Sequence, residues 1–105
     1  MNKTKLYKEN FMFGKFLDKA ILGKPQTDEM IYTTIKGVFN FLKNTQELKN
    51  IFKNIGFRFS FSETPKKIYS VFIDGKEYLP FQAIDFLHNR KYEKHLYKAG
   101  NDENK

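Results

Sequence analysis

The chain has 105 residues, a formal net charge of +7, twelve Phe and six Tyr, and no Cys. This length predicts a single domain over residues 1–105, in which residues 1–9 and 99–105 are expected to be loosely ordered ends. The missing cysteines exclude a disulfide scaffold and a thiolate metal site, and no segment has the length of a membrane span or the pattern of a signal peptide. We therefore expect a cytoplasmic protein that does not contact membranes.

Two amphipathic helices are predicted in the first half of the chain. Asn10 is expected to cap a helix over residues 11–22, whose apolar side chains recur at helical spacing, and Gly23 and Pro25 end it. Thr27 is expected to cap the second helix. The apolar stripe of that second helix consists of Ile31, Ile35, Val38, Phe39 and Leu42.

The clearest predicted helix begins at Asn44, which forms a capping-box pattern with Glu47, and it ends at Gly56. Its apolar side chains follow helical spacing at Leu48, Ile51, Phe52 and Ile55. Its outer side is expected to be polar and consists of Gln46, Lys49, Asn50, Lys53 and Asn54. We expect this polar side to be exposed.

From residue 57 the apolar period changes from that of a helix to that of a strand. In the first strand Phe57, Phe59 and Phe61 are expected to share one side. In the second strand Tyr69, Val71 and Ile73 are expected to share one side, and Ile68, Ser70 and Phe72 the other. Asp74-Gly75 predicts a tight turn into a short third strand. A last helix is predicted over residues 81–98, with a kink or a break near residue 89.

These elements predict an α+β fold: three helices, then a β-hairpin or three-stranded antiparallel meander, then a C-terminal helix. The order over residues 10–79 resembles that of a winged helix, in which the third helix enters the major groove and the hairpin loop touches the DNA backbone. The resemblance implies that amide and ammonium groups of these elements contact nucleic acid. The candidate nucleic-acid-binding residues are Gln46, Lys49, Asn50, Lys53, Asn54, Arg58, Lys66 and Lys67.

The phenylalanine stripe of the first strand admits a second interpretation, because aromatic side chains on a sheet can stack single-stranded bases. A stripe of period two is more often the core face of a sheet. This short chain needs Phe57, Phe59 and Phe61 for its core, so we prefer that interpretation.

No pattern predicts catalysis, a cofactor or a metal site. His88 and His95 lie two helical turns apart, about 10 Å, which is too far for both to bind one metal ion. The residues Asp74-Gly75-Lys76 are similar to an acidic-x-Lys element of metal-dependent nucleases, but a tight turn explains them fully. We expect a protein that is not an enzyme and that has no cofactor, no catalytic residues and no metal-binding residues.

The expected function is that of a small basic nucleic-acid-binding protein, a winged-helix-like regulator or DNA-replication accessory from a phage or other mobile element, with DNA or RNA as its partner. The alternative is a non-catalytic interaction module, a small subunit or inhibitor that docks on a larger nucleic-acid-processing protein. The charge is equally consistent with a composition that keeps a phenylalanine-rich chain in solution. An unpaired strand edge also leaves a homodimer open.

Overall fold

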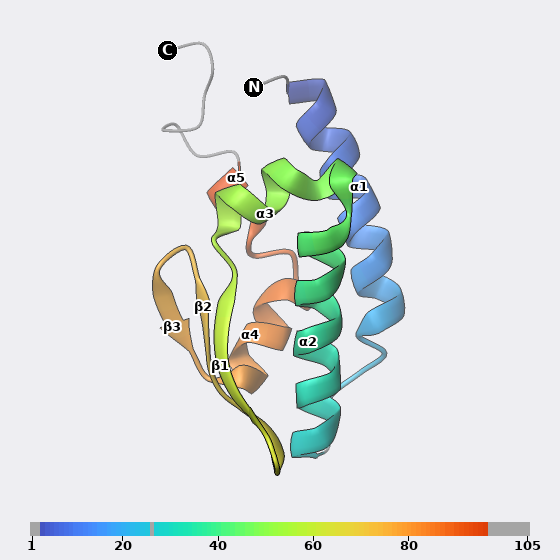
Figure 1. The fold of residues 1–105 in the computed structure, drawn as a ribbon. Helices are drawn as coiled ribbons and strands as arrows, with labels where there is room; N and C mark the ends of the chain where they lie inside the picture. Colours follow the sequence, from blue (N-terminus) through green and yellow to red (C-terminus); the bar gives the residue numbers. More distant parts are fainter. Residues whose placement is uncertain (1–2, 26, 97–105) are drawn as a thin grey trace.

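The computed structural model describes residues 3–25 and 27–96, with side chains from residue 5 onward. The elements in chain order (Figure 1) are α1 (Lys3–Ala20), α2 (Asp28–Asn44), the 3₁₀ helix η1 (Gln46–Leu48), α3 (Lys49–Ile55), β1 (Arg58–Glu63), β2 (Lys66–Ile73), β3 (Lys76–Tyr78), α4 (Pro80–His88) and α5 (Glu93–Leu96). This order confirms the predicted α+β fold, in which helices precede a three-stranded antiparallel sheet and a helical segment closes the chain.

The elements are arranged in layers, with the sheet on one side, α2 and α4 against it, and α1 on the far side of α2 (Figure 1). Both α2 and α4 pack on the same face of the sheet. The ring of Phe39 from α2 lies 5.0 Å from that of Phe59 in β1, and the ring of Phe86 from α4 lies 4.9 Å from that of Tyr78 in β3. One face of the sheet is therefore part of the core.

The first helix begins much earlier than predicted. It starts at Lys3 instead of residue 11, so residues 3–9 are not a loose end. Leu6 and Glu9 are each only 4% exposed, and they extend the buried side of the helix by two turns. Asn10 lies inside the helix, where it has no free N–H groups to cap; its side chain instead accepts a hydrogen bond from the hydroxyl of Tyr92 at 2.7 Å.

The second helix begins as predicted, because Thr27 Oγ accepts a hydrogen bond from the backbone N–H of Met30 at 3.1 Å. The capping role predicted for Asn44 at the start of the third helix is wrong. The backbone N–H of Thr45 still donates to the carbonyl oxygen of Phe41 at 3.1 Å, so Asn44 closes α2 and caps nothing. The chain turns at the extended residue Thr45 and continues through η1 into α3, which Gly56 ends in the left-handed conformation with a φ of 53°.

The three strands form a meander in the order β1-β2-β3. As predicted, Phe57, Phe59 and Phe61 share one side, since consecutive rings lie 6.3 Å and 5.3 Å apart. The core position predicted for Phe61 is wrong, because Phe61 is 42% exposed. The prediction for β2 was right for Val71, Ile73, Ser70 and Phe72 and wrong for Ile68 and Tyr69. A β-bulge shifts the register so that Ser60 pairs with Ser70 while Phe61 pairs with Ile68, which leaves Tyr69 as the extra residue. Ile68 therefore joins Val71 and Ile73 in the core, and Tyr69 is 53% exposed.

The closing helix is broken near residue 89, as one of the two predicted forms had it. Asn89 caps α4, Arg90 adopts a positive φ of 59°, and α5 follows from Glu93. The break allows residues on both sides of it to reach the core: Leu87 in α4 and Tyr92 after the break are both fully buried. Residues 97 and 98 of the predicted helix, and the predicted loose end at residues 99–105, lie outside the described residues.

Candidate nucleic-acid interface

Seven of the eight predicted contact residues fall into two groups that the structure does not bring together, and the eighth, Arg58, begins β1 between them. Gln46, Lys49, Asn50, Lys53 and Asn54 lie on η1 and α3, and Lys66 and Lys67 lie beside the β1–β2 turn. Figure 1 shows α3 and this turn at opposite ends of the molecule. Strand β1 alone, with 6 residues, separates them by about 17 Å. One ligand surface made of both groups would have to run along the whole sheet.

Only part of the α3 group faces solvent. Gln46, Lys49 and Lys53 are exposed, whereas Asn50 and Asn54 are half-buried. The Nδ2 of Asn50 donates to the carboxylate of Glu9 at 2.9 Å, and the Nδ2 of Asn54 is buried with no hydrogen-bond partner among the described residues. The expectation of a fully exposed polar side was therefore wrong for the two asparagines, and at Asn50 the reason is the contact with Glu9 of α1.

A groove of about 590 Å³ lies between α1 and the η1–α3 segment. The charged residues that line this groove are three lysines and two glutamates: Lys5, Lys8, Lys49, Glu9 and Glu47. The lysines of α1 were not among the predicted residues, because the chain before residue 10 was expected to be loose. Two carboxylates offset most of the positive charge, so this groove has little preference for a phosphate.

The sheet has one face that α2 and α4 leave uncovered, here called the outer face. The lysines of the β1–β2 turn, Lys66 and Lys67, lie at its end. Strand pairing and the two-residue alternation place on it Arg58, Ser60 and Ser62 of β1, Lys67, Tyr69, Ser70 and Phe72 of β2, and Glu77 of β3. Arg58 and Lys67, both predicted contact residues, lie on this face and are exposed. Lys66 pairs with Glu63 and lies toward the other side, so the two lysines of the turn do not act together.

Each cation of the outer face lies over an aromatic ring. The Cζ of Arg58 is 5.1 Å from the ring centroid of Phe72, and the Nζ of Lys67 is 5.7 Å from that of Tyr69. Phe72 was predicted on the side opposite Val71 and Ile73, where it lies, whereas Tyr69 was predicted on the same side as those two residues. The sequence gives no indication of the bulge at Tyr69, because alternation alone assigns this residue to the buried side.

The sheet is held to α2 by a hydrogen-bonded cluster near the β1–β2 turn. The hydroxyl of Tyr32 donates to Glu63 Oε1 at 2.5 Å, and Lys36 Nζ donates to Glu63 Oε2 at 3.3 Å. The hydrogen bond from Tyr32 is the main cause that lowers the pKa of Glu63, with Lys36 acting in the same direction. The same bond raises the pKa of the Tyr32 hydroxyl. Glu63 is thus engaged with the helical layer and does not offset the charge of the outer face.

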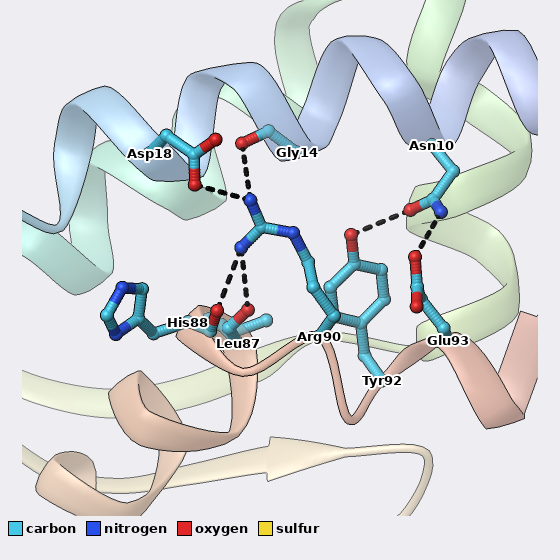
Figure 2. A network of polar contacts seen from close by, with 8 residues as sticks. All are labelled: Asn10, Gly14, Asp18, Leu87, His88, Arg90, Tyr92 and Glu93. Carbon is cyan, nitrogen blue, oxygen red and sulfur yellow. Dashed lines mark hydrogen bonds and ion pairs between the residues drawn. The ribbon is translucent and has the colours of Figure 1, made fainter.

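A second polar cluster fixes α1 to the α4–α5 junction (Figure 2). Arg90 donates to the carbonyl oxygen of His88 at 2.9 Å, to that of Gly14 at 2.9 Å, and to the carboxylate of Asp18 at 2.5 Å. Asn10 bridges to Glu93 at 2.6 Å beside it. Each of these groups is paired within the protein, which indicates a structural role.

Comparison with protein-family models, characterised proteins and solved structures returned no match. Across residues 3–25 and 27–96, no helix has both the length and the apolarity needed to cross a membrane. In the same part of the chain, no three His, Asp or Glu side chains gather into a group able to hold a metal ion.

Proposed function

We propose that this protein binds nucleic acid and that the outer face of the sheet is the contact surface. The supporting observation is the composition of that face: Arg58 and Lys67 flank Phe72 and Tyr69, and β1 and β2 carry no carboxylate on it, whereas Glu77 of β3 lies opposite Phe72. Cations suit the phosphate backbone, and aromatic rings suit the faces of bases. The proposed role is that of a non-catalytic accessory or regulatory protein acting in the cytoplasm.

This proposal gives α3 a smaller part than the winged-helix resemblance implies. A recognition helix needs an exposed face that reaches base edges. In this protein α3 has 7 residues and uses Asn50 for an internal contact with Glu9. The proposed contact surface does not include its exposed residues Gln46, Lys49 and Lys53.

The proposal is tested by the salt dependence of binding to a fluorescein-labelled oligonucleotide of about 12 nucleotides, a length within the usual site sizes. Anisotropy titrations over a series of salt concentrations give the slope of log K against log salt. Each phosphate contact to a single strand contributes about −0.7 to this slope. Replacing both cations in the double variant R58Q/K67Q is therefore expected to weaken binding and to reduce the slope by about 1.4.

The matched control is K49Q/K53Q, which lowers the formal net charge of +7 by the same amount on α3. It is expected to change affinity and slope little. Equal effects of the two double variants would show that net charge alone governs binding. A larger effect of K49Q/K53Q would move the interface to α3. No binding of the parent protein to DNA or RNA at low salt would refute the function itself.

A protein-interaction module is the second candidate, and one observation favours it. Tyr7 and Phe11, one helical turn apart on α1, are 55% and 69% exposed. They line a groove of about 340 Å³ beside Arg90 at the α4–α5 junction. Large aromatic residues of this kind are enriched at protein interfaces. The double variant Y7S/F11S tests this candidate: a stoichiometric partner that the parent protein captures and the variant loses supports it, and equal capture by both excludes this surface.

A further inference from the structure

We propose that the β-bulge at Tyr69 forms a stacking site for an unpaired base, so that the outer face takes single-stranded nucleic acid in preference to a duplex. This inference rests on the proposed function, since it names the form of the ligand. It adds Tyr69 as a binding residue, although alternation in the sequence assigns Tyr69 to the core, and it names base stacking as the mode of contact.

The bulge is the reason that Tyr69 is at the surface. Ser60 pairs with Ser70 and Phe61 with Ile68, so one extra residue of β2 opposes no residue of β1. Bulges re-aim a side chain and are common next to functional sites. Without the bulge, Tyr69 would share the buried side with Val71; with it, Ile68 takes the core position at 4% exposure and Tyr69 is 53% exposed.

The ring of Tyr69 is held in place from two directions. Its hydroxyl donates to Ser62 Oγ on β1 at 3.3 Å, so the side chain reaches across from β2 to its neighbouring strand. The Nζ of Lys67 lies 5.7 Å from its ring centroid. A ring that spans two strands and is half exposed offers a broad, pre-positioned apolar surface. Base–aromatic stacking uses such a surface and tolerates any base.

The rest of the outer face suits the other parts of a single strand. Arg58 lies over Phe72 at 5.1 Å, which presents a guanidinium plane on which a second base can stack. Ser60 and Ser70, 3.0 Å apart, provide hydroxyl groups between the two aromatic residues. The acidic residue of this face, Glu77, is on β3, so charge complementarity favours a path along β1 and β2.

A duplex fits this surface less well, because its base faces are covered by stacking within the helix. A tyrosine on a sheet can reach a base face only where the strand is unpaired. A duplex would therefore contact only the cations, Arg58 and Lys67. The inference accordingly predicts that Tyr69 contributes to binding of single strands and not to binding of duplexes.

The first test compares Tyr69→Ala with Tyr7→Ala, a control that removes a similarly exposed tyrosine from α1. Tyr69→Ala is expected to weaken binding to a single-stranded oligo-dT about 5- to 150-fold, the range measured for loss of one base–aromatic stack. Tyr7→Ala is expected to leave the affinity for oligo-dT unchanged. Tyr69→Ala is expected to leave the affinity for a duplex of the same length unchanged. Tyr69→Phe, which keeps the ring and loses the hydroxyl, is expected to retain most of the affinity.

The second test uses Tyr69→Trp, because the chain contains no other tryptophan. Stacking of a base on the indole is expected to quench its fluorescence when oligo-dT is added, and the duplex is expected to leave it unchanged. Oligo-dT that binds without quenching, or an equal loss of single-strand and duplex affinity in Tyr69→Ala, would overturn the stacking site while nucleic-acid binding itself stood. If neither oligo-dT nor the duplex binds the parent protein, the proposed function fails and the stacking site with it. In another outcome, Tyr69→Ala binds oligo-dT as the parent does and yet loses a protein partner that the parent captures. That result would overturn the stacking site and assign this face to a protein partner.

Discussion

The Nη2 of Arg90 donates a hydrogen bond to the backbone carbonyl oxygen of Gly14 at 2.9 Å, which joins the end of α4 to the middle of α1 (Figure 2). The backbone of Arg90 is at the same time left-handed, with a φ of 59°. The side chain and the backbone of this residue therefore have opposite effects on the stability of the fold. The guanidinium bonds stabilise the junction, and the left-handed conformation costs an L-residue about 1–2 kcal/mol.

Two substitutions at this position separate these effects. Arg90→Ala is expected to lower the free energy of unfolding by roughly 1.5–3 kcal/mol, because it removes hydrogen bonds from a charged donor. Arg90→Gly loses the same bonds but adopts the positive φ without strain, so it is expected to be about 1 kcal/mol more stable than Arg90→Ala. Urea denaturation measures both. Identical midpoints for the two variants would show that the backbone of residue 90 stores no strain.

The contact of Glu63 with Tyr32 and Lys36 predicts a specific dependence of stability on pH. Because the pKa of Glu63 is lowered in the folded protein, chiefly by the hydrogen bond from Tyr32, its contribution is present at neutral pH. That contribution is lost as the pH falls through the folded-state pKa, which lies below the roughly 4.3 of an unperturbed glutamate. The pKa of Tyr32 is raised, so its part of the contact is lost only as the pH rises above the usual value of about 10.

Thermal unfolding of Glu63→Gln against the parent protein checks this dependence. The parent is expected to be more stable at pH 7, and the difference is expected to shrink toward zero once Glu63 is protonated in both states at strongly acidic pH. Asp28→Asn serves as the control, since Asp28 is exposed at the start of α2 and outside the cluster. A difference for Glu63→Gln that is the same at every pH would contradict the assignment.

Local chemistry was enough to predict most of the fold. Thr27 as a cap, Gly56 as a helix end and Asp74-Gly75 as a turn each depend on neighbouring residues in the chain. The failures involve contacts between distant residues. Asn10 looks like a cap in sequence, but its partners Tyr92 and Glu93 come from the other end of the chain, and they hold it inside a longer helix.

The candidate site was less predictable than the fold for the same reason. Whether Asn50 faces solvent depends on Glu9 of α1, and whether Tyr69 is buried depends on a bulge that alternation cannot reveal. The prediction from the sequence that Arg58 and Lys67 are surface residues is correct. Alternation also places Phe72 on the side opposite Val71 and Ile73, but the pairing of Phe72 with Arg58 depends on strand register.

Two glycines provide a matched test of backbone conformation. A Cβ at Gly37, inside α2, would meet no atom within 4 Å, so Gly37→Ala is expected to raise the free energy of unfolding by up to about 1 kcal/mol. A Cβ at Gly56 would also have room, with Asp74 N the nearest atom at 3.8 Å. The left-handed φ of Gly56 nonetheless makes Gly56→Ala destabilising by about 1–2 kcal/mol. Melting temperatures that move in the same direction for both variants would contradict this interpretation.

Asn50 and Asn54, one helical turn apart on α3, distinguish a structural role of this helix from a binding role. The amide of Asn50 donates to the carboxylate of Glu9, which is 4% exposed, whereas the Nδ2 of Asn54 has no such bond among the described residues. Asn50→Ala leaves a buried carboxylate oxygen without its partner and is expected to cost about 1–3 kcal/mol of unfolding free energy. Asn54→Ala is expected to cost less.

Binding measured on the same two variants completes the comparison. With the outer face of the sheet as the interface, both variants are expected to bind oligo-dT as the parent protein does, under conditions where each remains folded by circular dichroism. The winged-helix resemblance predicts instead that both variants lose affinity, because each removes an amide from the recognition helix. Loss of binding in Asn54→Ala at unchanged stability would therefore favour α3, because the Nδ2 of Asn54 has no hydrogen-bond partner among the described residues whose loss could explain it.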